Sequence, residues 1–379
     1  MSRSIVFVLH GIGEYSDTWL DNKSSAVTAL KKGAENCEFF KNRSLDSFTE
    51  FVPILYDDIF DKVIDHWSDL ASGLNSAVPV MPSAPGKVLE HVEAINQDQW
   101  WKRTGLDVVL YWGFRLFQQR ITLRVLNQIT GKIADSIDSA APTTSFHVLA
   151  HSLGTAVAHD ALHHLGTEQW LQSVPVENLD SEGSEEVVKE QKRLNENLSW
   201  LKGHYGHRNP FAPDVFVFKS VTMLSNVSGL IYHAENPYRS IVRPTTSQTS
   251  DACCFSYLNI NHKYDPISHA GSFKMPKSWK LNGDGIDVWL NHVIDDPRNI
   301  HDASHYTSHP DVYLRLLQHY VEPFFANDAD LNLITSFKRR HDLKRDDSAL
   351  KNKLEDISEG KEGTHRQLIS LISSLAGGL

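Results

Sequence analysis

Residues 146–162 read FHVLAHSLGTAVAHDAL, and this stretch decides which kind of fold to expect. A strand-like run over residues 146–150 leads into the small and polar residues around Ser152, and a helix-like run follows. A strand that passes directly into a helix is typical of an α/β protein. Ser152 is either the N-cap of that helix or a nucleophile exposed on a sharp turn, which small flanking residues permit. Ala150 and Gly154, two positions to either side, are both small.

Strand-like and helix-like segments alternate along most of the chain. Strand-like runs cover residues 5–9, 51–56, 146–150, 215–224, 256–260 and 285–294, and helical spacing of apolar residues covers 19–32, 117–137, 155–164 and 310–320. This alternation predicts an α/β fold: a mostly parallel central sheet of about six strands with helices on both faces. Pro53 favours an edge position for its strand, because proline cannot donate to a neighbouring strand.

Two segments interrupt the alternation, at residues 57–103 and 166–213. Both are longer than ordinary connections between strand and helix, so we expect insertions. The prediction is an α/β domain over residues 1–326 and a charged helical extension over residues 327–379. Within that extension four apolar residues have the spacing of a short amphipathic helix, which packs on the domain or contacts a partner or second copy: Leu368, Leu371, Ile372 and Leu375.

Composition excludes several classes of protein. The formal charge of −10 gives no footprint for nucleic acid or for anionic membrane. Cys37, Cys253 and Cys254 provide neither a disulfide framework nor paired zinc spacing, which favours a reducing compartment. The start of the chain does not resemble a signal peptide, and no apolar run is long enough for a transmembrane helix. We therefore expect a cytoplasmic protein, with signal-independent export left open.

Twenty histidines raise the question of a metal. His159, His163 and His164 lie on the predicted helix after Ser152, but no His-Glu-x-x-His motif is present and Asp160 is the nearby carboxylate. A solvated helix face is the expected explanation. No glycine-rich phosphate loop follows a strand, so we expect neither a metal nor a cofactor.

The stretch AHSLGTAVAHDAL resembles the nucleophile elbow of the α/β-hydrolase superfamily, in particular its lipase-like and phospholipase-like members. The resemblance covers roughly residues 4–321 and is specific at the elbow and at His10–Gly11. Ala150 stands where the usual pattern has glycine. The resemblance implies that Ser152 is the nucleophile.

The same resemblance implies an oxyanion hole and a truncated sheet. In these hydrolases the loop after the third strand and the residue after the nucleophile supply the two N–H donors. The corresponding donors here are the backbone N–H groups of Ile12 and Leu153. Because the His10–Gly11 loop follows the first strand of this chain, the family's first two strands would be missing.

The acid and the base should follow Ser152 in that order. Asp265 comes after a strand-like run and before Pro266, as in the acid loop of lipase-like members, and Asp251, Asp284 and Asp287 are weaker rivals. The segment IHDASHYTSHPDV holds three candidates for the base: His301, His305 and His309. We assign His305, because His305-Tyr306 resembles the family's His-x-x-Tyr segment, although the tyrosine is adjacent here.

The resemblance therefore implies a serine hydrolase of the lipase or esterase type. It would cleave an ester-type, acyl or lipid-like bond through a Ser-His-Asp triad and an acyl-enzyme, without a cofactor. The insertion at residues 166–213 is a candidate lid, since lids commonly lie between elbow and acid in this superfamily. A peptidase or thioesterase on the same triad remains open, and so does a catalytically inactive fold used as a binding module.

Overall fold

The fold was analysed in a computed structural model. It describes residues 3–11, 18–23, 25–59, 115–138, 144–168, 181–206, 208–212, 215, 218–229, 232, 234–245, 252–265, 267–268, 273–280, 284–292, 300–322 and 324–341. Ile12 therefore lies outside the described residues. So does the insertion expected at residues 57–103, apart from residues 57–59.

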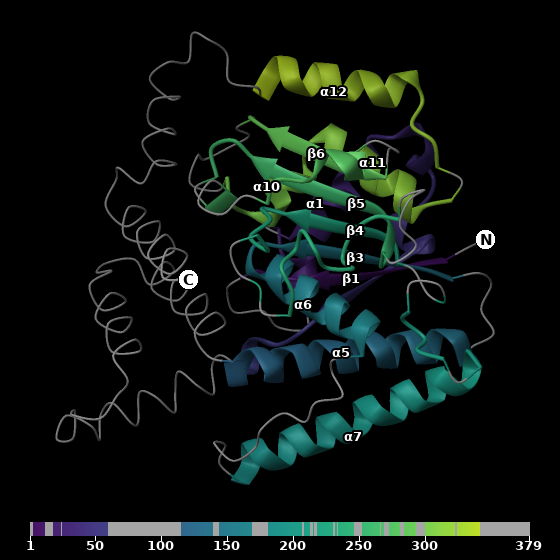
Figure 1. The fold of residues 1–379 in the computed structure, drawn as a ribbon. Helices are drawn as coiled ribbons and strands as arrows, with labels where there is room; N and C mark the ends of the chain where they lie inside the picture. The colour runs from purple at the N-terminus through teal and green to yellow at the C-terminus, as the bar shows by residue number, and fades with distance from the viewer. Residues whose placement is uncertain are drawn as a thin grey trace, which may run out of the picture.

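The centre of the molecule is a six-stranded sheet in the order β2-β1-β3-β4-β5-β6, with every neighbouring pair parallel (Figure 1). The strands are β1 (Arg3–Leu9), β2 (Thr49–Ile54), β3 (Thr144–His151), β4 (Phe218–Leu224), β5 (Cys254–His262) and β6 (Gly285–Leu290). The predicted α/β fold with about six strands is confirmed, and the sheet is wholly parallel. Pro53 lies in β2 at the edge, opposite Val8 of β1, as its missing N–H requires.

Helices cover both faces of the sheet because successive side chains of a strand point to opposite faces. Ile5, Phe7 and Leu9 of β1 pack into one apolar core, with α5 (Arg115–Asp138) and α6 (Leu153–Thr167). Val6 and Val8 pack into a second core on the other face. That second core includes residues of α1 (Ala26–Glu35), α10 (Ala303–Thr307) and α11 (Pro310–Tyr320).

Four further short helices in the described part of the chain lie between the longer elements. They are η1 (Trp19–Asp21), η2 (Glu38–Phe40), η3 (Leu45–Ser47) and α9 (Lys277–Lys280). The helix expected over residues 19–32 is thus split into η1 and α1, with Ser25 capping α1 through its side chain.

The second insertion contributes one long helix, α7 (Ser181–His204), which packs along α5 as an outer layer (Figure 1). Arg124 of α5 joins the two helices through ion pairs with Glu186 at 2.8 Å and with Glu190, and it also pairs with Asp58 at 3.0 Å. α5 therefore lies between α7 and the rest of the domain. Residues 169–180, 207 and 213 of this insertion lie outside the described residues.

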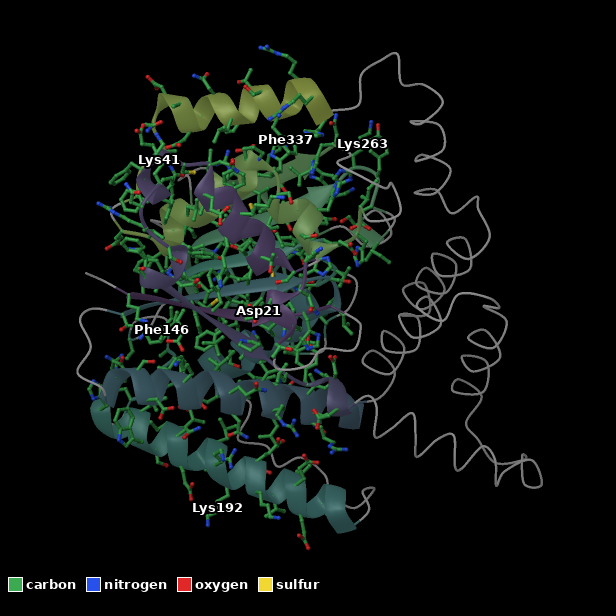
Figure 2. The ribbon with its side chains drawn as sticks, turned by 180° about the vertical axis from the view of Figure 1, so that it is seen from behind. Asp21, Lys41, Phe146, Lys192, Lys263 and Phe337 are labelled. Carbon is green, nitrogen blue, oxygen red and sulfur yellow. The ribbon has the colours of Figure 1, made fainter. Side chains whose placement is uncertain are left out.

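The expected C-terminal extension opens with α12 (Asp328–His341), which contacts α11 at the opposite end of the molecule from α7 (Figure 1). Phe337 anchors it, since its ring lies 5.2 Å from that of His292 and 4.8 Å from that of His309. Figure 2 shows Phe337 on the side of α12 that faces the domain. The amphipathic helix expected over residues 368–375 lies outside the described residues.

No helix among the described segments has the length and apolar character needed to cross a membrane. The thiols of Cys37, Cys253 and Cys254 are all free and buried.

Candidate active site

Ser152 occupies a strained turn between β3 and α6. Its backbone has φ 55° and ψ −129°, a conformation that residues other than glycine rarely adopt. Although Ser152 stands at the N-cap position, its side chain makes no capping hydrogen bond. The hydroxyl is therefore not committed to the helix, and the strain serves to present it at the carboxyl end of the sheet.

Two glycines allow this turn to form. A Cβ at Gly154 would lie 2.2 Å from the carbonyl oxygen of His10, and one at Gly11 would lie 2.8 Å from the Cβ of Ser152. Any side chain at either position would push the loop after β1 away from the start of α6. Strand order also reverses here, since β2 and β3 lie on opposite sides of β1. Ligands of open parallel sheets bind at such a switch point, beyond the carboxyl ends of the strands.

His301 lies between Ser152 and Asp265. The Ser152 hydroxyl donates to Nε2 of His301 at 3.0 Å, and Nδ1 of His301 donates to Oδ2 of Asp265 at 2.8 Å. The carboxylate therefore favours the tautomer whose Nε2 lone pair faces the serine. Three side chains from three distant parts of the chain form one continuous hydrogen-bonded row.

Asp265 is fully buried, and its carboxylate is heavily hydrogen bonded. Four groups besides His301 donate to it: the hydroxyls of Ser225 at 2.7 Å, Ser268 at 3.1 Å and Tyr306, and the backbone N–H of Ile267 at 2.9 Å. Burial alone would raise the pKa of Asp265, but the charge of His301 and these hydrogen bonds hold it well below its ordinary value. The acid is consequently ionised at neutral pH.

The pKa of His301 is shifted in the opposite direction. Burial alone would lower its pKa, but the charge of Asp265, their hydrogen bond and the nearby Asp302 raise it above the ordinary value of 6.5. A base of raised pKa accepts a proton readily and holds the resulting charge against Asp265. This pairing suits proton transfer from the hydroxyl of Ser152.

The structure does not bring His305, which we assigned as the base, to Ser152; His301 occupies that position instead. Nε2 of His305 donates to the backbone carbonyl of His292 at 3.1 Å, and the two rings stack at 4.3 Å. The physical reason is the short helix α10, which begins after His301 and carries His305 about one turn further along. His309, the third candidate, accepts from the backbone N–H of Asp311 and caps α11.

Several residues that contact the row have no role in the sequence prediction. Ser225 follows β4 directly and adopts φ 48°, a second strained serine beside the acid. Nε2 of His151 donates to the backbone carbonyl of His301 at 2.8 Å and connects the turn at Ser152 to the loop that carries His301. Ser225 only follows a strand and His151 only precedes Ser152, so neither belongs to a distinctive sequence motif. The sequence therefore offered little signal for either residue.

The two expected oxyanion donors differ in what the structure describes. Leu153 is the first residue of α6, where the backbone N–H has no acceptor within its own helix. It adjoins Ser152, as the expectation requires. Ile12 lies outside the described residues, although the preceding His10–Gly11 pair contacts the elbow.

The helix after the elbow does not present a solvated histidine face, which corrects that expectation. His159 and His163 are buried, at 1% and 5% exposure, because the segment that contains Ser240 and Ile241 covers this side of α6. Nδ1 of His163 and the hydroxyl of Ser240 lie 3.0 Å apart. Burial, together with the neighbouring histidines, lowers the pKa of His163 to about 4, so it is neutral at physiological pH.

The histidine group nearest to a metal site consists of His262, His292 and His305, whose ligand atoms lie within 4.8 Å of one another. Both nitrogens of His262 are engaged with backbone groups, those of Tyr264 at 3.1 Å and His292 at 2.8 Å. The rings of His292 and His305 are parallel to within 5°, so their in-plane lone pairs do not converge on one point. This arrangement fits a hydrogen-bonded brace between loops better than it fits a metal.

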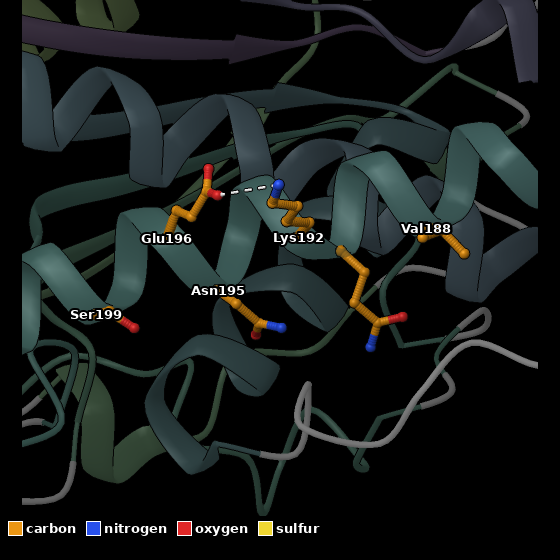
Figure 3. A pocket seen from close by; sticks show the side chains of 6 residues that line it. Val188, Lys192, Asn195, Glu196 and Ser199 are labelled. Atoms are coloured by element: carbon orange, nitrogen blue, oxygen red, sulfur yellow. Dashed lines mark ion pairs between the residues drawn. The ribbon is translucent and has the colours of Figure 1, made fainter.

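A hollow of about 630 Å³ lies on the outer face of α7 (Figure 3). Six side chains of that helix line it: Val188, Gln191, Lys192, Asn195, Glu196 and Ser199. None of them belongs to the candidate site, and an exposed ion pair between Lys192 and Glu196 crosses it. The hollow is therefore separate from the Ser152 region.

No family model and no curated protein sequence matches this chain. Among solved structures, the chain is similar to one described as a novel cutinase-like protein from Cryptococcus sp.. The two share 10% sequence identity over 84% of this chain and 95% of that chain, with a TM-score of 0.31. A similarity at this level carries no argument about the activity of this protein.

Proposed function

We propose that this protein is a serine hydrolase that cleaves ester-type bonds through an acyl-enzyme. The observation that carries the proposal is the hydrogen-bonded row of Ser152, His301 and Asp265, with the serine on a strained turn at the switch point of the sheet. The order of the three along the chain is serine, acid, histidine, which is the order in α/β-hydrolases.

In the proposed reaction the Oγ of Ser152 attacks the acyl carbon of an ester while its proton moves to Nε2 of His301. The backbone N–H groups of Leu153 and Ile12 would hold the oxyanion of the tetrahedral intermediate. His301 then returns the proton to the departing alcohol, which leaves an ester between Ser152 and the acyl group. Water then attacks this ester while His301 takes one of its protons, and His301 passes that proton to the departing Oγ of Ser152 as the acid is released.

The favoured substrate is a small-molecule or lipid-like acyl ester. This choice rests on the resemblance of the elbow to lipase-like members, and the net charge of −10 argues against a nucleic acid as partner. A cytoplasmic location and self-association through the helix at residues 368–375 belong to the same proposal. Both rest on the sequence alone.

A fluorophosphonate probe tests the nucleophile directly, since it reacts only with an activated serine. We expect labelling of the wild type and of Ser44→Ala, an exposed control, and none of Ser152→Ala. Absence of wild-type labelling in the folded protein would overturn the proposal and favour a binding module.

A second measurement separates reaction classes on the same triad. Turnover of p-nitrophenyl acyl esters of several chain lengths is compared with matched anilides and thioesters. Preference for the oxygen esters supports the proposal, whereas faster cleavage of the anilides or thioesters would replace it with a peptidase or a thioesterase.

A further inference from the structure

Tyr306 is a buried tyrosine whose hydroxyl reaches the acid of the proposed triad. It lies on α10, is fully buried, and donates to Oδ2 of Asp265. The centroid of its ring lies 6.0 Å from that of His151, and its hydroxyl oxygen lies 3.1 Å from that of Ser268. Tyr306, on the helix that follows His301, therefore contacts both the loop of Asp265 and the turn at Ser152.

The hydrogen bonds to Asp265 are distributed unevenly between its two oxygens. Oδ1 accepts one backbone N–H, whereas Oδ2 accepts all the side-chain donors, including Nδ1 of His301. The other three donors to Oδ2 are hydroxyls: those of Ser225, Ser268 and Tyr306. The oxygen that faces His301 thus shares its negative charge with three further groups.

Sharing of this kind has two physical consequences. Donors fixed in three directions hold the carboxylate in one rotamer, which aims Oδ2 at Nδ1 of His301. Each donor also draws charge from Oδ2, and this weakens the attraction that the carboxylate exerts on a protonated imidazole. Loss of one donor would strengthen that attraction.

We propose that Tyr306 is a positioning residue of the triad: its hydroxyl fixes the Asp265 carboxylate and moderates the hold of that carboxylate on protonated His301. The catalytic part of this inference rests on the proposed function. Its electrostatic part concerns only the three named side chains and holds in the resting protein.

The other ionisable groups around the pair stay in place when Tyr306 is changed. Asp302 lies on the loop of the base, His151 on the elbow and His262 at the end of β5, and each is electrostatically coupled to Asp265 or His301. Burial, with the repulsion of its charged neighbours, lowers the pKa of both His151 and His262 to about 3, so neither changes charge near neutral pH. Burial raises the pKa of Asp302 above its ordinary value, so the titration of His301 is followed by the signals of its own imidazole.

The test is Tyr306→Phe, which removes the hydroxyl and keeps the ring. We expect the pKa of His301, followed by imidazole NMR signals assigned with a His301→Ala sample, to rise by roughly half a unit to one unit. The acid limb of kcat/KM should move upward by the same amount. Tyr320→Phe, a change at another fully buried tyrosine that packs against His147, should move neither.

A lower or unchanged pKa of His301 in folded Tyr306→Phe would overturn the inference. A fall in kcat without a shift of the acid limb would assign Tyr306 a packing role alone. Ser268→Ala removes a second donor from the same oxygen and should raise the pKa in the same direction, which keeps the test available if Tyr306→Phe does not fold. If the NMR shift appears but the wild type hydrolyses no ester, the proposed function fails while the electrostatic inference stands.

Discussion

Gly154→Ala is the most demanding test of the way in which the fold forms the elbow. The new Cβ would lie 2.2 Å from the carbonyl oxygen of His10, 2.9 Å from that of Leu9 and 3.0 Å from the carbonyl carbon of His10. All three atoms belong to the backbone of β1 and its loop, so no side chain can rotate away. The start of α6 must therefore move by about 1 Å to reach ordinary van der Waals contact.

This displacement sets the expected magnitudes. Overpacking against backbone costs about 2–3 kcal/mol in unfolding free energy, only partly offset by the better helix propensity of alanine. Because Ser152 lies two residues away, a shift of about 1 Å should also lower kcat/KM roughly 100-fold. Urea unfolding gives the first quantity, and ester turnover or fluorophosphonate labelling gives the second.

Gly203→Ala is the matched control, because a Cβ at this exposed position near the end of α7 meets nothing within 4 Å. It should stabilise the protein slightly, by roughly 0.5 kcal/mol, and leave turnover unchanged. The reasoning would be refuted if Gly154→Ala matched the wild type in both stability and labelling, or if both glycine variants lost activity equally.

Three further predictions concern the base and the helical layer. His301→Ala should lower ester turnover by roughly 10⁴-fold or more. His305→Ala should leave the row of Ser152, His301 and Asp265 in place and should mainly lower stability. The opposite ranking in turnover would favour His305 as the base. The acid limb of kcat/KM should have its midpoint above pH 6.5, because the charge of Asp265 outweighs the effect of burial on His301, and activity should fall as pH drops through that midpoint; a midpoint well below 6.5 would contradict the pairing. Arg124→Met should cost roughly 1–3 kcal/mol of unfolding free energy, since it removes the arginine that pairs with the partly buried Glu190. Lys192→Ala, in the exposed pair on α7, should change stability by less than about 0.5 kcal/mol; equal effects in urea unfolding would argue against the α5–α7 brace.

The strands and the turn at Ser152 were predictable because they depend on local sequence patterns. A buried parallel strand reads as a short apolar run, and β1, β3 and β4 each contain one. The N1 proline of α11 likewise marks where that helix begins. The turn at Ser152 could be recognised because a strand-like run, small residues and a helix-like run follow one another along the chain.

The histidine that contacts Ser152 was not predictable by the same means. Three histidines fall within nine residues, and each is a plausible base by composition. The choice depends on where α10 begins, and a five-residue helix leaves almost no periodic signal. The histidines of α6 show the same limit, since the segment around Ser240 that buries them is distant in sequence.

The sequence by itself determined the alternation of strands and helices, the six-stranded sheet and the serine at the end of its third strand, because these depend on residues that are neighbours along the chain. Tertiary structure decided which groups meet at that serine. His301 rather than His305 faces Ser152, and Ser225 and Tyr306 surround Asp265, because three strand ends and α10 converge at one edge of the sheet. Contacts across 149, 40 and 41 residues of chain follow from packing, and no local pattern encodes them.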